Sequence, residues 1–146
     1  MNSTRFPMFY ICLILFPFTQ LTSCVYSDFF WAKDVDVILK NELHVPANVR
    51  CKSRDNDLGD HEISIGNTYK FSFKTNFWGT TLFWCKIWYK KYPNSEKYSE
   101  ANFEVYSSES HTEHCDHICT WELLDSGIYS YDPYNNRSIK EYDWNN

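Results

Sequence analysis

The sequence predicts an all-β domain, an antiparallel β-sandwich of about seven or eight short strands that disulfides stabilise. Three observations support this class. Apolar and polar residues alternate with a period of two in several runs, turn residues recur at regular intervals, and no stretch shows a convincing helical period. A closed barrel would produce the same pattern, so the strands alone leave sandwich and barrel open.

The first 27 residues have the organisation of a secretory signal peptide. Arg5 provides a short positive region, and an apolar run extends from Met8 to Phe18. This run is shorter than the roughly 20 apolar residues of a membrane-spanning helix, so we expect cleavage between about residues 23 and 27 and a secreted chain. A bacterial-type lipobox ending at Cys24 is the alternative. Residues 28–131 are then the predicted β-sandwich domain, and residues 132–146 a polar C-terminal tail.

Alternation marks the strands of the N-terminal half. The apolar positions are Val35, Val37 and Leu39, then Val49 and Cys51 after Pro46, then Ile63 and Ile65, and then Tyr69, Phe71 and Phe73. Gly66-Asn67 separates the last two runs and predicts a hairpin turn between them. The charged segment 52–59 predicts a loop that Gly59 closes, because glycine tolerates the positive φ that such turns use.

The C-terminal half begins with the strand predicted to be central. Residues 81–89 are apolar on both faces, which is typical of the middle of a packed sheet. Further strands are predicted at 103–106, 118–124 and 128–131, the last two joined by the turn Asp125-Ser126-Gly127. The first polar loop spans residues 90–101 and the second polar loop spans residues 107–117. The tail 132–146 is predicted to be mobile, and Asn136 begins an Asn-Arg-Ser glycosylation sequon within it.

Cysteine usage supports an oxidising compartment. Of the six cysteines, Cys12 and Cys24 leave with the signal peptide, so Cys51, Cys85, Cys115 and Cys119 are the predicted disulfide cysteines. Three connectivities are open. A Cys115–Cys119 bridge would close only a small loop and remove little entropy from the unfolded chain, which favours pairing each of these two with a distant cysteine.

Composition argues against nucleic-acid binding and catalysis. The formal net charge is −5 and no basic stripe is present, so the electrostatic footprint of a nucleic-acid binder is missing. No nucleophile elbow, zinc-protease motif or phosphate-binding glycine loop occurs. We therefore expect a non-enzymatic monomer without a cofactor, a nucleic-acid partner or membrane insertion after cleavage.

Two clusters resemble metal sites. His111, His114 and His117 surround Cys115 and Cys119, but the spacing matches no zinc module and oxidation would remove the thiolate ligands. Asp55, Asp57 and Asp60 suggest calcium, yet they lack the order of ligands of an EF-hand. No metal is expected at either cluster.

Recognition is expected to reside in the two polar loops, because long loops on a rigid β-scaffold commonly carry binding residues. Lys91 and Glu96 of the first polar loop and Glu109 and His114 of the second are the predicted partner-binding residues. A glycan-binding or defence-related module is the alternative. Its stacking platform would consist of Trp78, Trp88, Trp121 and Tyr89, although alternation favours core positions for Trp84 and Trp121.

An ordered set of motifs resembles the plant self-incompatibility protein S1 family, also called S-protein homologues. The motifs are Val35-x-Val37 with Asn41, Cys51-Lys-Ser with Asp57-Leu-Gly59, Tyr69-x-Phe71-x-Phe73, the run from Gly79 to Cys85, Cys119-x-Trp121, and Gly127-Ile-Tyr129. The resemblance implies a small secreted β-sandwich protein of plants. Founding members of the family are stigma-secreted determinants that act as ligands on incompatible pollen.

Three positions depart from the family pattern. Arg50 stands where the family often has His, Asn56 interrupts an acidic run, and Ser126 replaces a common Asp. These positions do not affect the fold, but the allele-specific function of the founding members does not transfer with scaffold residues. The expectation is a ligand for an unknown cell-surface partner, in reproduction or development.

Overall fold

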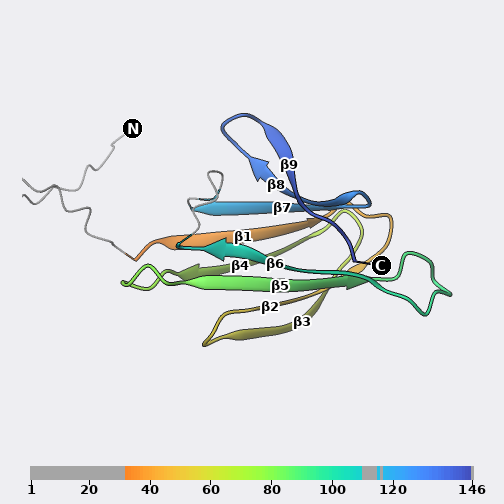
Figure 1. The fold of residues 1–146 in the computed structure, drawn as a ribbon, viewed down its shortest axis with the longest axis horizontal. Coiled ribbons are helices and arrows are strands. Elements are labelled where there is room, and N and C mark those ends of the chain that lie inside the picture. Colours follow the sequence, from red (N-terminus) through yellow and green to blue (C-terminus); the bar gives the residue numbers. More distant parts are fainter. Residues whose placement is uncertain (1–31, 110–114, 116, 146) are drawn as a thin grey trace, which may run out of the picture. The chain divides into compact units, whose positions relative to one another are not determined.

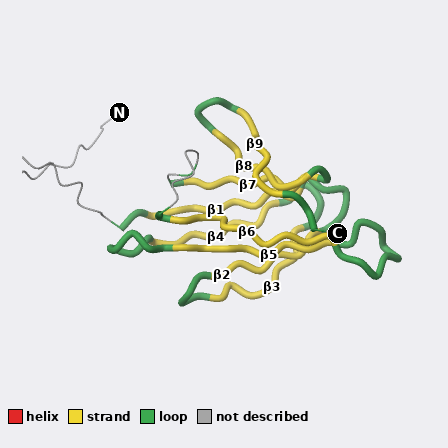
Figure 2. The backbone as a smooth tube through the Cα atoms, viewed as in Figure 1, coloured by secondary structure: helices red, strands yellow, loops and turns green. Residues whose placement is uncertain are grey.

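The structure, a computed structural model, describes residues 32–109, 115 and 117–145, which form a sandwich of two β-sheets (Figure 1). These residues form nine strands: β1 (Asp34–Asn41), β2 (Ala47–Lys52), β3 (Asp57–Ile63), β4 (Thr68–Lys74), β5 (Leu82–Tyr89), β6 (Ser99–Ser107), β7 (Ile118–Leu124), β8 (Gly127–Asp132) and β9 (Arg137–Tyr142). The predicted all-β class is confirmed, with nine strands in the described residues where seven or eight were predicted. Figure 2 shows only strands and loops in the described part, where no helix is long and apolar enough to cross a membrane.

The five-stranded sheet has the order β4-β1-β7-β8-β9 and is not purely antiparallel. β1 pairs antiparallel with β4 and parallel with β7, in a register that places Asp36 opposite Ile118. The alternation predicted for β1 is confirmed, because Val35, Val37 and Leu39 are buried and the residues between them are half-buried. Period-two alternation does not report strand direction, so the parallel pair was not predicted.

The four-stranded sheet has the order β3-β2-β5-β6, with β5 in its interior as predicted. The two faces of β5 differ. Phe83, Cys85 and Ile87 are buried, whereas Trp84 and Trp88 on the opposite face are half-buried. The prediction that both faces are covered is therefore wrong, and so is the core position for Trp84. Antiparallel sheets in a two-layer sandwich keep one face in contact with water.

The Gly66-Asn67 turn changes sheets, so the predicted hairpin is wrong. β3 pairs with β2 in one sheet and β4 pairs with β1 in the other. Asn41 at the end of β1 holds this connection: its backbone N–H donates to Asn67, and Gly66 donates to the carbonyl of Asn41. A glycine turn between two apolar runs has the same local signature in a hairpin and in a crossing between sheets.

Gly59 lies within β3, and not at the end of a loop as predicted. Its φ is 78°, and the pairing of β3 with β2 shifts register between Arg50 and Lys52. A glycine of positive φ at a register shift is the geometry of a β-bulge. The predicted need for a positive φ at this position is confirmed, whereas the position in the fold was wrong.

The C-terminal segment is ordered, so the prediction of a mobile tail is wrong. β9 pairs with β8, Trp144 packs against the ring of Tyr89, and Asn145 forms backbone hydrogen bonds of 2.8 and 2.9 Å with Glu100. Glu100 belongs to β6, so the C-terminus connects the edges of the two sheets. Buried Asp132 accepts hydrogen bonds from Tyr134 and Asn135 and shapes the turn into β9.

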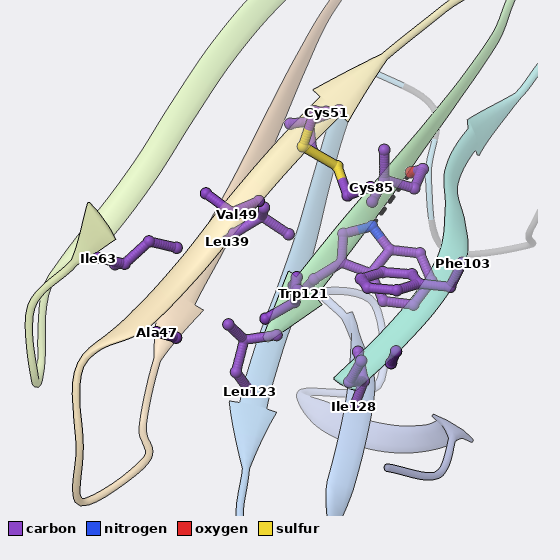
Figure 3. Packing of buried hydrophobic residues seen from close by; sticks show 14 of the residues in the cluster. Leu39, Ala47, Val49, Cys51, Ile63, Cys85, Phe103, Trp121, Leu123 and Ile128 are labelled. Carbon is purple, nitrogen blue, oxygen red and sulfur yellow. Dashed lines mark hydrogen bonds between the residues drawn. A yellow bond between two sulfur atoms is a disulfide. The ribbon is translucent and has the colours of Figure 1, made fainter. Parts of the chain in front are cut away.

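The core lies between the sheets and draws residues from both (Figure 3). Trp121, predicted to be core, is 2% exposed and packs edge-on against Phe103, with ring centroids 5.1 Å apart. Its indole N–H donates to the carbonyl of Val105 at 3.1 Å, which links β7 of one sheet to β6 of the other. The sheets are therefore held in one relative position by oriented contacts as well as by apolar burial.

Candidate recognition surface

Two disulfides brace the frame that presents the loops. Cys51 on β2 lies opposite Cys85 on β5, with Cα atoms 4.1 Å apart, and the two are bonded. Cys115 is bonded to Cys119 at the start of β7, with a Cα separation of 4.7 Å. The preference for pairing Cys115 and Cys119 with distant cysteines is wrong. Cys51 and Cys85 are cross-strand neighbours and bond to each other, which leaves Cys115 and Cys119 to pair together. The distance between cysteines in the folded chain therefore decides the pairing, and not the entropy of loop closure.

A buried amide fixes the end of the sandwich where β1 terminates. The Asn41 side chain donates to the carbonyls of Val45 and Ile63, at 3.0 and 2.8 Å, and accepts from the N–H of Leu43 at 3.0 Å. Asn41 is fully buried, and every one of these bonds joins it to backbone. A satisfied buried amide of this kind makes the connections at this end rigid.

The first polar loop and the described start of the second, residues 107–109, lie at opposite ends of β6. The first polar loop precedes β6 and the second follows it, so the whole strand separates them (Figure 1). Nine residues of extended strand span about 30 Å. The predicted pair Lys91 and Glu96 is therefore far from Glu109, and the structure does not bring the predicted partner-binding residues into one surface. His114 lies outside the described residues.

The first polar loop is shorter than predicted, because β6 begins at Ser99, and it spans residues 90–98. Lys91, Tyr92 and Glu96 are exposed, and Tyr92 is 64% exposed. Inside the loop Ser95 bonds to the backbone of Tyr92 and Lys97, and the ammonium group of Lys90 lies 5.2 Å from the ring centroid of Tyr98. The loop thus has internal structure while its polar side chains face solvent.

The lysines of this loop differ from most cations of the protein. In the part of the chain that the structure describes, most lysines and arginines have a carboxylate within 4.0 Å, as in the pairs Lys86–Glu100 and Lys70–Asp36 at 2.8 Å. The cations without such a partner there are Lys52, Lys90, Lys91 and Lys97. Three of these lie in one loop, which makes it a basic projection on a protein of net charge −5.

The second polar loop begins against the β4–β5 connection. The N–H of Ser108 donates to the carbonyl of Thr81 at 2.9 Å, and the N–H of Glu109 donates to the hydroxyl of Ser107 at 3.3 Å. Glu109 is exposed. The Cys115–Cys119 bridge lies where the chain enters β7, so the loop is constrained at both of its described ends.

The three aspartates that resembled a calcium site, Asp55, Asp57 and Asp60, form ion pairs with arginines. Arg50 donates two hydrogen bonds to Asp57, at 2.7 and 3.1 Å, and one to Asp60 at 3.4 Å. The Arg50 guanidinium, with a hydrogen bond from the backbone of Gly59, lowers the pKa of Asp57 to about 2. Asp55 pairs with Arg54 instead. No group of at least three potential metal ligands gathers within the described residues, and part of the histidine cluster lies outside them.

The aromatic platform considered for glycans does not form. Trp121 and Tyr89 are buried in the core, whereas Trp78 is 81% exposed in the β4–β5 connection and Trp88 is half-buried on the outer face of β5. Asn136 is exposed in the β8–β9 turn, at a φ of 48°, and its glycosylation stays a prediction.

Fold and surface together define a class: a small, disulfide-bonded, two-sheet β-sandwich with an exposed basic loop at one end. Comparison with known proteins assigns the family within that class. A family model described as "Plant self-incompatibility protein S1" matches residues 36–144. The chain belongs to this family, as the sequence motifs indicated.

Individual relatives agree with this assignment. S-protein homolog 21 of Arabidopsis thaliana is 37% identical over 115 residues, covering 73% of this chain and 79% of its own. Self-incompatibility protein S1 of Papaver rhoeas is 27% identical over 128 residues, covering 86% and 84%. A solved structure of SPH proteins, described as small, highly stable, secreted proteins from plants, has a TM-score of 0.56 at 16% identity and covers 79% of this chain and 97% of that one, which shows the shared fold.

Proposed function

We propose that this protein is a secreted, non-catalytic ligand whose first polar loop contacts an acidic segment of a cell-surface protein. The observation that carries the proposal is the concentration of lysines without carboxylate partners in residues 90–98. Charged groups on a folded surface commonly attract a partner of opposite sign and orient its approach. A basic projection on an otherwise acidic protein therefore selects an acidic partner and orients the protein toward it.

The loop also has the rigidity that specific binding requires. The Lys90–Tyr98 contact and the turn at Ser95 hold it from within, and the Asn41 hydrogen bonds fix neighbouring connections at the same end. A surface that is ordered before binding loses less conformational entropy on association. Exposed Tyr92 adds an amphipathic ring of the kind that is enriched at protein interfaces.

Secretion is supported by three independent features. The N-terminal sequence has the organisation of a signal peptide. The four described cysteines form two disulfides, which persist in oxidising compartments. The solved structure of the shared fold is described as belonging to secreted plant proteins.

The absence of catalysis is proposed on the chemistry of the described side chains. General acids and nucleophiles usually have pKa values shifted toward neutrality by burial or by like charges. The pKa values of two surface carboxyl groups, Asp36 and Asp57, are both shifted downward, chiefly by hydrogen bonds from the basic side chains Lys70 and Arg50. Carboxylates held ionised in this way belong to surface ion pairs and not to an acid–base pair.

The proposal is tested by proximity labelling of membrane proteins with the secreted, oxidised protein. A Lys91→Glu/Lys97→Glu variant is compared with Lys52→Glu, which also reverses a lysine without a carboxylate partner but lies at the other end of the sandwich. We expect the loop variant to lose the labelled partner and the Lys52 variant to retain it. Since both changes are on the surface, thermal midpoints should stay close to that of the parent.

Alanine substitutions then distinguish the two loops. Lys91→Ala and Glu96→Ala should change partner affinity, whereas Glu109→Ala should leave it unaltered, because Glu109 lies at the other end of β6. Exchange of residues 90–98 for those of a paralogue should change the partner while the fold persists. An exchanged protein that keeps its partner and affinity would contradict the proposal, as would equal labelling by the charge-reversed and parent proteins.

A further inference from the structure

A cleft of about 330 Å³ opens at the end of the sandwich opposite the first polar loop. It lies where the β2–β3 turn, the C-terminal end of β4 and the start of β5 come together. Its lining residues are Ser53, Arg54, Asp55, Asn56, Phe73, Lys74, Asn76, Thr80, Thr81, Leu82, Phe83 and Trp84. The volume is at the lower end of the roughly 300–1,000 Å³ typical of small-ligand sites.

One aromatic side chain of the cleft, Trp84, remains partly accessible to a ligand. Trp84 lines the cleft and is half-buried, and within the described residues its indole N–H has no acceptor and its ring packs against no other aromatic ring. In contrast, the indole nitrogens of Trp121 and Trp144 both donate to backbone carbonyls. Trp84 therefore offers an apolar ring and a free donor together, the combination that suits an amphipathic ligand.

The polar component consists of neutral groups with unused hydrogen-bonding capacity. Ser53, Thr80 and Thr81 each accept a hydrogen bond through the side-chain oxygen, and each hydroxyl retains a hydrogen to donate. The carboxamide of Asn56 has no partner among the described residues. Hydroxyl and amide groups of this kind match the hydroxyl groups of a sugar.

Each charged side chain that lines the cleft has a partner of opposite sign, in the lining or next to it. Arg54 pairs with Asp55 at 3.1 Å, and Lys74 lies 3.9 Å from Asp34. Lys52, which lies opposite Trp84 and has no carboxylate partner within the described residues, borders the cleft without lining it, so the lining itself holds no cluster of unpaired charges like that of the first polar loop. Its chemistry favours an uncharged ligand.

The wall formed by the β4–β5 connection is preorganised. The Asn76 side chain donates to Thr80 at 2.8 Å and accepts from the Thr80 N–H at 2.9 Å, and the Asn76 N–H donates to Thr81 at 2.7 Å. The same connection exposes Phe77 and Trp78, which are 56% and 81% exposed, with ring centroids 5.4 Å apart. A tightly bonded loop that holds two rings in water is typical of a binding surface.

We propose that this cleft binds a neutral oligosaccharide, with a sugar ring stacked on Trp84, ring hydroxyls bonded to Ser53, Asn56, Thr80 and Thr81, and the continuing chain in contact with Trp78. The inference is independent of the proposed cell-surface ligand role, since it uses residues at the other end of the sandwich. It assigns the protein a second binding activity, toward uncharged glycans.

The test is titration of the secreted, oxidised protein with linear neutral oligosaccharides built from glucose, xylose or mannose, and with an oligogalacturonide as a charged control. Binding is measured by calorimetry and by tryptophan fluorescence. Trp84→Ala is compared with Trp88→Ala, because both residues are half-buried on the same face of β5 and only Trp84 lines the cleft. Trp78→Ala is the second variant, since a side chain so exposed contributes little to folding.

We expect at least one neutral oligosaccharide to bind and the oligogalacturonide to bind no better. Trp84→Ala should weaken binding about tenfold or more, as expected when an aromatic anchor is lost. Trp78→Ala should weaken it less, and Trp88→Ala should leave it unchanged. The inference is overturned if no neutral oligosaccharide binds at millimolar concentration, if the charged one is preferred, or if Trp84→Ala and Trp78→Ala both bind as tightly as the parent. An equal loss in Trp88→Ala would also overturn it, because the site would then extend along β5 outside the cleft.

Discussion

The indole N–H of Trp144 donates a hydrogen bond of 2.7 Å to the backbone carbonyl of Leu124. Leu124 ends β7, so the bond attaches the C-terminal segment to the five-stranded sheet. The Trp144 ring also packs edge-on against Tyr89 of the other sheet, with centroids 5.0 Å apart. Substitution Trp144→Ala should therefore lower the free energy of unfolding by about 2–3 kcal/mol, the sum of lost ring packing and an unsatisfied carbonyl.

Urea denaturation measures this effect, and Tyr134→Ala is the matched control. Tyr134 is also an aromatic residue of the C-terminal segment, but it is 79% exposed. Its removal should change stability by no more than about 0.5 kcal/mol. Equal midpoints for the two variants would show that the ordered C-terminus contributes nothing to folding.

The two disulfides should contribute unequally to stability. The residues of the Cys51–Cys85 bridge are 34 apart in sequence, and those of Cys115–Cys119 are 4 apart. The loop-entropy relation assigns about 4 kcal/mol to the first bridge and about 2 kcal/mol to the second. Double alanine variants of each pair, compared by chemical denaturation, should follow this order. Thiol labelling of the denatured, unreduced parent should find no free cysteine among these four; the reverse order of stability would mean that chain entropy does not govern their contribution.

Gly59→Val should destabilise the protein more than Asp55→Ala. An added Cβ at Gly59 meets no atom within 4 Å, so the cost arises from the backbone φ of 78° and not from a clash. A β-branched residue in this conformation costs on the order of 1–2 kcal/mol. Gly59→Asn serves as the control, because Asn tolerates positive φ and should be milder. Thermal midpoints report the result, and equal values for Val and Asn would argue against a backbone origin.

The pKa of Asp57 should depend on Arg50. The guanidinium hydrogen bonds lower this pKa from 3.8 to about 2, so the interaction favours the folded chain above the ordinary pKa and is lost as pH falls through about 2. In an Arg50→Gln variant, the Asp57 pKa measured by carboxyl NMR titration should rise toward 3.8. Asp36 is the internal reference, because its pKa is lowered by Lys70 and Ser72 and should not change. A parent Asp57 that titrates near 3.8 would refute the bidentate pair.

The elements that could be predicted are those with one buried face. In β1 and β7 every second side chain is buried in the core, so the alternation of apolar and polar residues along the sequence predicts the strand. β9 was missed because Ile139 and Tyr142 are its only partly buried residues, and backbone pairing with β8 is what forms the strand. A pattern method has no signal for a strand whose side chains face water on both sides.

For the candidate sites too, local features could be predicted from the sequence and long-range contacts could not. Loop length and polarity are local, so the first polar loop could be found from sequence. The lack of ion partners for its lysines could not, because the partners of other lysines come from distant strands, as Asp36 of β1 does for Lys70 of β4. The cleft was missed for the same reason, since Ser53 and Trp84 come together only when β2 pairs with β5, and Phe73 of β4 reaches them from the other sheet. The wrong grouping of Glu109 with Lys91 has a related cause, because the sequence did not show that the full length of β6 separates them.

The parallel pairing of β1 with β7 determines when this protein can fold. β1 lies inside its sheet, between β4 and β7, so its second hydrogen-bonding edge stays open until residues 118–124 exist. A chain synthesised from its N-terminus therefore completes most of its length before that sheet can close. Contacts between segments so distant in sequence slow folding and leave an apolar strand edge exposed in the meantime. The sheet thus closes late, and the Cys51–Cys85 bridge, whose cysteines are made earlier, is a covalent link that can form before residues 118–124 arrive.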